Sequence, residues 1–111
     1  PPKTPGRRRW FCDDAMDLIV WYAAGGDVQG FQLCYDIGRL ERALTWKRDG
    51  QLEHSIVDLG DAQPQRDDAP ILIPTPRPFP EDLPRSFEAR AASLDPDLVQ
   101  LVLAVLTGAA V

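Results

Sequence analysis

One thiol, one imidazole and two carboxylates are the side chains of this sequence that could together support nucleophilic catalysis. Cys34 is a candidate nucleophile, and His54, the single histidine, is the base that would activate it. Asp36 or Asp58 would then orient the imidazole. The alternative is that Cys34 is a buried structural thiol and His54 is structural or simply exposed, because free cysteine is among the most buried residue types. No cysteine-enzyme motif surrounds Cys34.

A second set of side chains with metal-binding chemistry is acidic. Asp13, Asp14 and Asp17 cluster around the start of an apolar run, and Asp36 follows a later one. Residues 13–36 contain five aspartates and no lysine or arginine, and a divalent cation would relieve the repulsion among such carboxylates. The sequence has neither an EF-hand pattern nor an HExxH motif. We therefore predict a solvated acidic face with no metal or cofactor, and these four aspartates are the candidates if a metal does bind.

Aromatic side chains are concentrated in the first half of the chain. They could stack on a ligand or on a base, and the alternative is that they pack across neighbouring strands. The set comprises Trp10, Phe11, Trp21, Tyr22, Phe31, Tyr35 and Trp46.

The segments that must position these side chains have the composition of strands. Gly30–Asp36 alternates between two faces, and Asp49-Gly50 between two such runs predicts a hairpin. The spacing of the runs favours an antiparallel meander over βαβ units. The predicted strands are Arg9–Cys12, Asp17–Ala23, Gly30–Asp36, Glu41–Lys47 and Leu52–Leu59, with Ile71–Ile73 as a short edge strand.

Prolines dominate the segment that follows the predicted sheet. Residues 61–70 are polar and predict a loop, and four alternating prolines from Pro74 to Pro80 favour an extended backbone. We interpret residues 74–84 as a strap that covers the sheet or its edge. Docking of the prolines in the aromatic groove of a partner is the alternative.

One or two helices are predicted over about residues 82–107. Asp95-Pro96 has the types preferred at the N-cap and the first helical position, and Gly108 is a stop signal. The helix between them is apolar almost all round, which is typical of a helix buried on two sides. The sequence therefore predicts either burial in the core or a homodimer or protein-partner interface through Asp95–Leu106.

The charge of the chain excludes one common class of partner. The net charge is −5, from 12 basic and 17 acidic residues, so we predict no nucleic acid. Residues 1–12 carry +4 and the remainder −9. We predict that residues 1–8 form a flexible basic arm, which either contacts an acidic partner or is a solvated tail.

The sequence predicts a cytoplasmic protein that does not enter a membrane. No apolar stretch reaches the roughly 18 residues of a membrane-spanning helix, and the N-terminus lacks the pattern of a signal peptide. The two cysteines, Cys12 and Cys34, have no CxxC spacing and indicate reduced thiols rather than a disulfide framework.

A resemblance to a known family covers roughly residues 9–60, and Gly30–Asp36 (GFQLCYD) is its most specific part. The string WF…DLIVW…GFQLCYD…ALTW…H…VD resembles a family of short, uncharacterised proteobacterial proteins. The resemblance implies an antiparallel sheet with a C-terminal helix and implies no activity. That family has an acidic Asp-Gly-Glu stretch after Val-Asp, whereas this chain has Leu59-Gly60-Asp61, so no role of that loop is carried over. The matching residues are Trp10-Phe11, Asp17–Trp21, Gly30–Asp36, Ala43–Trp46, His54 and Val57-Asp58.

Together these patterns predict one α+β domain over residues 9–111. An antiparallel meander of about five strands occupies about residues 9–73, and one or two C-terminal helices pack on it. Either Val20 or Trp21 faces the helices, because an error of one residue in register moves every side chain to the other face. The predicted core residues are Val20, Trp21, Phe31, Leu33, Leu44, Trp46 and Ile56.

With no recognisable catalytic motif, the sequence predicts a non-catalytic interaction or accessory protein. It would act through the sheet surface or through the apolar helix. The alternative is a small metal- or ligand-binding protein, or an enzyme, that uses Cys34, His54 and nearby aspartates. That alternative requires these side chains to converge in one concave site.

Overall fold

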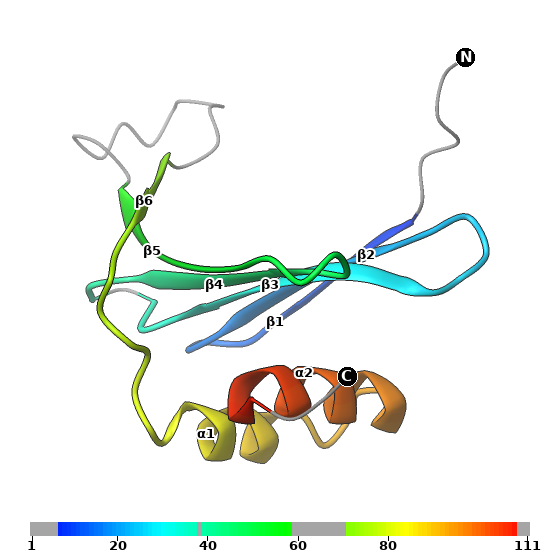
Figure 1. Cartoon of the computed structure of the whole chain (residues 1–111). Coiled ribbons are helices and arrows are strands. Elements are labelled where there is room, and N and C mark those ends of the chain that lie inside the picture. The colour runs from blue at the N-terminus through cyan, green and yellow to red at the C-terminus, as the bar shows by residue number, and fades with distance from the viewer. Residues whose placement is uncertain (1–6, 38, 59–70, 109–111) are drawn as a thin grey trace, which may run out of the picture. The chain divides into compact units, whose positions relative to one another are not determined.

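The computed structural model describes residues 7–37, 39–58 and 71–108, which belong to two compact units that divide after Arg77. The first unit is a six-stranded antiparallel sheet, and the second contains two helices (Figure 1). The predicted α+β class, with an antiparallel sheet followed by C-terminal helices, is confirmed. The division falls inside the predicted strap of residues 74–84, whereas the sequence predicts one domain over residues 9–111.

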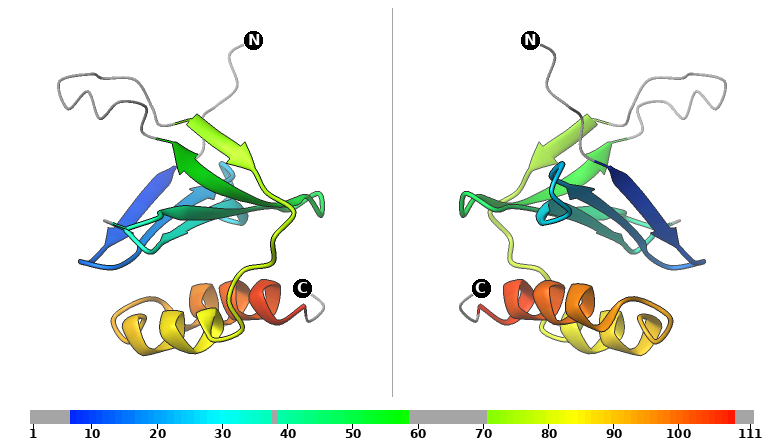
Figure 2. Two further views of the ribbon diagram at one scale, coloured as in Figure 1. Left: turned by 90° about the vertical axis from the view of Figure 1, so that its left-hand side faces the viewer. Right: turned by 90° about the vertical axis from the view of Figure 1, so that its right-hand side faces the viewer.

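The strands follow one another across the sheet in chain order, each antiparallel to the next. In Figure 2 the two edge strands slant in opposite directions, as the twist of a wide sheet requires. The meander is therefore confirmed, with Ile71–Pro74 as its sixth strand. The strands are β1 (Arg8–Cys12), β2 (Asp17–Tyr22), β3 (Val28–Tyr35), β4 (Arg42–Lys47), β5 (Leu52–Asp58) and β6 (Ile71–Pro74).

The hairpin between β4 and β5 forms where Asp49-Gly50 predicts it. Gly50 has a φ of 101°, which a residue with a side chain rarely adopts. The backbone N–H of Lys47 donates to the carbonyl of Gln51 at 2.9 Å and closes the turn. The Asp49 carboxylate accepts from the Gln51 N–H at 3.0 Å, so the aspartate stabilises the same turn.

One face of the sheet, the core face, carries the largest buried side chains of the first unit. Val20 is fully buried on this face, whereas Trp21 is half-buried on the opposite one, so of the two only Val20 is a core residue. The prediction of Trp21 as a core residue is therefore wrong, and Ile56 is only half-buried. The core face is defined by Leu18, Val20, Phe31, Leu33, Tyr35, Leu44 and Trp46.

The opposite face, the Trp21 face, is mixed in character. The register brings Arg8, Trp21, Gly30 and Lys47 into one row across β1 to β4. Nearer the other end of the strands, Cys34, Ala43 and Val57 form a small buried cluster against which Leu72 packs. The Trp21 face is defined by Arg8, Trp10, Ile19, Trp21, Gly30, Gln32, Cys34, Thr45 and Lys47.

A bulge interrupts the pairing of β2 with β3. Trp21 is opposite Gly30 and Tyr22 is opposite Val28, so Gln29 is the extra residue on β3. Arg48 ties the bulge from the neighbouring hairpin. Its backbone N–H donates to the carbonyl of Gln29, and its guanidinium donates to the carbonyl of Val28 at 2.8 Å.

The second unit consists of α1 (Leu83–Arg90) and α2 (Pro96–Thr107), which lie side by side in Figures 1 and 2. The Asp95 side chain accepts from the Asp97 N–H at 3.3 Å, and Gly108 ends α2 with a φ of 77°. The predicted start and end of this helix are therefore confirmed.

Two predicted regions lie partly or wholly outside the described residues. These are residues 1–6 of the basic arm and the polar loop at 61–70. Strand β1 begins at Arg8, the last residue of the predicted arm. Within the described part of the chain, neither helix has the length and apolar character needed to cross a membrane.

Candidate functional site

The structure does not bring Cys34 and His54 together. Cys34 is opposite Ala43, which is opposite Ser55, whereas His54 is opposite Leu44 on the core face. Residues at adjacent positions of a strand point to opposite faces, so the thiol and the imidazole lie on different sides of the sheet. A base must be within hydrogen-bonding reach of the nucleophile that it activates, and this pair does not meet that requirement.

The surroundings of Cys34 are those of a structural thiol. The side chain is 6% exposed, and the Gln32 amide donates a hydrogen bond to Sγ at 3.5 Å. Burial raises the pKa of the Cys34 thiol, the hydrogen bond from Gln32 acts in the opposite direction, and the charges of Glu41 and Asp17 raise the pKa further. A thiol in this environment is protonated at neutral pH, when only the thiolate is a good nucleophile. Cys12, by contrast, is exposed.

His54 links three parts of the sheet unit. Its Nδ1 lies 2.7 Å from the backbone carbonyl of Arg77, which can only accept, so Nδ1 carries the proton. In the neutral ring Nε2 is then an acceptor, and the Tyr35 hydroxyl donates to it at 2.5 Å. The His54 carbonyl also accepts from the Thr75 N–H at 2.9 Å. These bonds fix the segment that leaves β6 against β5 and β3.

Asp36 and Arg42 extend this arrangement at the end of β3. The Arg42 guanidinium donates to the Asp36 carboxylate and lies over the Tyr35 ring, 5.0 Å from its centre. Burial raises the pKa of the Tyr35 hydroxyl, while the Arg42 charge lowers it and the Asp36 charge raises it. Asp36 therefore pairs with an arginine rather than with His54. The Asp58 side chain lies outside the described part of the structure.

The predicted acidic candidates do not form a metal centre. The Asp13 carboxylate accepts from the N–H groups of Ala15 and Met16, both at 2.8 Å, in the turn that also holds Asp14. Over residues 7–37, 39–58 and 71–108, no group of three or more His, Cys, Asp or Glu side chains is placed to hold a metal ion. Asp17, at the start of β2, has its pKa raised by burial and by the charge of Asp13.

The aromatic side chains fall into two groups. Four rings lie under a guanidinium, at 4.9 to 5.2 Å from the ring centre, and are thereby covered. The other three of the predicted set, Trp10, Trp21 and Phe31, have no such cover. Phe31 is fully buried and packs on Trp46, whereas Trp10 is 61% exposed. The covered pairs are Phe11 with Arg9, Tyr22 with Arg7, Tyr35 with Arg42 and Trp46 with Arg48.

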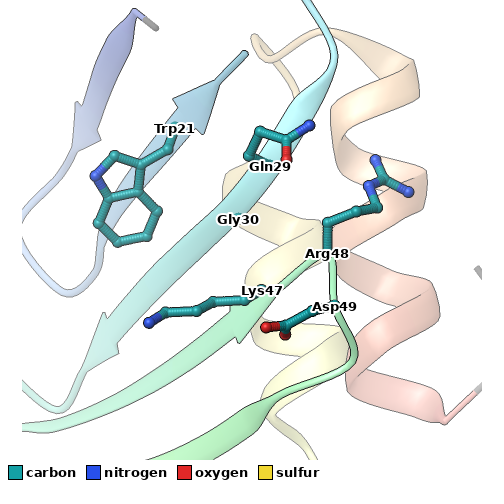
Figure 3. A pocket seen from close by; sticks show the side chains of 6 residues that line it. All are labelled: Trp21, Gln29, Gly30, Lys47, Arg48 and Asp49. Atoms are coloured by element: carbon teal, nitrogen blue, oxygen red, sulfur yellow. The ribbon is translucent and has the colours of Figure 1, made fainter. Parts of the chain in front are cut away.

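A groove of about 330 Å³ lies on the Trp21 face, above Gly30. Figure 3 shows the Trp21 indole and the Lys47 side chain on either side of this glycine. Gly30 has no side chain to fill the space between them, so its backbone is the floor of the groove. The groove is lined by Trp21, Gln29, Gly30, Lys47, Arg48 and Asp49.

Sequence reasoning identified only one wall of this groove, Trp21. Lys47 was placed correctly at the end of a predicted strand, but nothing local indicates that it shares a face with Trp21. Gly30 begins the predicted strand but lies inside β3 (Val28–Tyr35), where a glycine often marks a bulge or a close approach. No family model, curated protein or solved structure matches this chain.

Proposed function

We propose that the protein is a non-catalytic binding protein and that the Trp21 face is its contact surface. The observation that carries this proposal is Trp10, a tryptophan 61% exposed on a strand, with Trp21 as its diagonal neighbour on the same face. Large aromatic side chains contribute much of the binding energy at protein interfaces. The described large apolar residues that are exposed all belong to the sheet unit: Trp10, Leu40, Leu52 and Ile73.

The arrangement of the polar candidates supports a binding role over an enzymatic one. Cys34 is buried, has a raised pKa and has no imidazole on its face. His54 uses both ring nitrogens in hydrogen bonds to Tyr35 and Arg77. The family resemblance of residues 9–60 stays a prediction, and that resemblance implies no enzymatic activity.

A ligand-mapping experiment tests the proposal. The ¹⁵N-labelled protein is titrated with a library of small aromatic compounds and short peptides, and chemical shifts are followed. We expect the shifts to centre on β1 to β4 around Trp10 and Trp21, and Trp10→Ser to weaken that binding. Leu52→Ser is the matched control, because Leu52 is also an exposed apolar residue, at 49%, but lies opposite Trp46 of the core face.

The competing enzymatic hypothesis predicts different results. Its ligands would shift the resonances of Tyr35 and His54 instead of those of the Trp21 face. It also predicts that Cys34 reacts with a thiol reagent faster than a free cysteine at neutral pH. We expect the reverse: rapid labelling at Cys12 that Cys12→Ser removes, and slow labelling at Cys34. Ligand-induced shifts at Tyr35 and His54 in place of the Trp21 face, or fast labelling of Cys34, would overturn the proposal.

A further inference from the structure

The row that crosses the Trp21 face combines an indole with two cations. Arg8 is opposite Trp21, Trp21 is opposite Gly30, and Gly30 is opposite Lys47. Neighbouring strands lie about 4.8 Å apart, so Trp21 and Lys47, which are two strands apart and line the same groove, are in reach of one small ligand. Figure 3 shows the Trp21 ring and the Lys47 side chain bordering the same space.

The positive charges of this row are not neutralised by neighbours. Within the described part of the chain, neither Arg8 nor Lys47 forms an ion pair, whereas Arg42 pairs with Asp36. Asp49 is the single carboxylate that lines the groove, and it accepts a hydrogen bond from the backbone of its own turn. Arg48 also borders the groove, but its guanidinium lies over the Trp46 ring of the core face and donates to the Val28 carbonyl. Among the described residues, Lys47 is therefore the cation that the groove offers to a ligand, with Arg8 further along the row, on a chain whose net charge is −5.

The floor of the groove is built for close approach. A methyl group at Gly30 would lie 3.5 Å from Cε3 of Trp21 and would occupy the space beside the indole. The bulge at Gln29, held by Arg48, borders the same groove. Bulges of this kind occur often beside binding sites, because they re-aim a side chain.

From these observations we infer that the groove binds a small planar anion, whose ring stacks on Trp21 and whose negative group pairs with Lys47. This inference rests on the proposed function and names its ligand class. Aromatic stacking and charge pairing are the two interactions that the walls offer. A carboxylate on an aromatic ring and a nucleoside monophosphate share this chemistry.

The test separates the ring from the charge. The ¹⁵N-labelled protein is titrated with 2-naphthoate and adenosine 5′-monophosphate, with their neutral counterparts 2-naphthamide and adenosine, and with inorganic phosphate. We expect both planar anions to shift the Trp21 indole N–H and the Gly30 amide saturably. The neutral counterparts should bind a few-fold more weakly, and phosphate alone should not saturate. Preference for one planar anion identifies which source the groove selects.

Two variants and one control assign the interactions. Lys47→Gln should remove the preference for the anion over its neutral counterpart, and Trp21→Leu should weaken both by roughly tenfold. Arg39→Gln removes the same charge at an exposed position outside the groove and should leave the preference intact. Higher salt should reduce the preference as well, because an exposed ion pair is screened.

The outcomes distinguish the two proposals. Equal binding of anionic and neutral rings at Trp21 would overturn the planar anion while leaving the Trp21 face as a contact surface. Shifts around Trp10 with none at Gly30 would also overturn the planar anion and leave the Trp21 face as a contact surface. If no compound or peptide perturbs the Trp21 face, both proposals fail.

Discussion

At the scale of single residues, the hydroxyl of Tyr35 is expected to contribute to stability. It donates to Nε2 of His54, and Tyr35 is 2% exposed. Tyr35→Phe leaves the imidazole acceptor without this donor, so we predict a loss of about 1 kcal/mol in the free energy of unfolding, measured with urea. Tyr22→Phe is the control, because the Tyr22 hydroxyl has no hydrogen-bond partner among the described residues. Equal stability of the two variants would contradict the structural role given to His54.

Two carboxylates on the sheet unit make stability depend on pH. Burial raises the pKa of Asp17, with a further contribution from Asp13, and burial and the Asp17 charge raise the pKa of Glu41. A carboxyl group whose pKa is higher in the folded state than in the unfolded state favours folding when protonated. That contribution is complete below the ordinary carboxyl pKa and is lost as pH rises through the raised value.

Asp17→Asn should therefore stabilise the protein at neutral pH. We expect a gain on the order of 0.5 kcal/mol, because the site is only partly buried, and no gain in acid, where Asp17 is already protonated. Urea unfolding at several pH values measures both. Asp27→Asn makes the same change in net charge within an exposed turn. A gain at Asp17 that persists unchanged in acid would show that ionisation is not its cause.

At the scale of secondary-structure elements, the pairing of β3 with β4 depends on Gly30. A Cβ at this position would lie 2.6 Å from the backbone carbonyl oxygen of Trp46, which cannot move without disturbing the ladder. We predict that Gly30→Ala lowers the free energy of unfolding by about 1 to 3 kcal/mol. Gly25→Ala is the control, since its Cβ would meet nothing within 4 Å. If Gly30→Ala left the free energy of unfolding unchanged, β3 and β4 would be able to move apart more easily than this register implies.

At the scale of the whole molecule, self-association through Asp95–Leu106 stays a prediction. Four α2 residues are buried, but Val99 and Leu103 remain half-buried on a neighbouring stripe of the helix. We expect the mass measured by light scattering to rise with concentration toward that of two chains. Leu103→Glu should return it to one chain, and the exposed control Gln100→Glu should not. A single-chain mass at every concentration would remove the homodimer.

The candidate site shows where prediction from sequence ends. Cys34 and His54 lie on strands, as predicted, but the catalytic alternative requires them on one face of the sheet. Cys34 shares its face with Ser55, and His54, one residue away, points to the other face. The sequence indicated Trp21 as a candidate for stacking on a ligand. It did not indicate that Gly30 and Lys47 lie next to Trp21 across the sheet. Their proximity arises from pairing between segments about ten to twenty residues apart.

The sequence by itself determined the elements of this protein. Asp49-Gly50 fixes a hairpin, and Asp95 and Gly108 bound α2, because these are local interactions within a few residues of chain. Only the tertiary structure decided which side chains share a face. Pairing across strands and the extra residue Gln29 set that outcome, and neither is encoded within any one strand. For that reason Cys34 and His54 lie on opposite faces of the sheet, whereas Trp21 and Lys47 line the same groove.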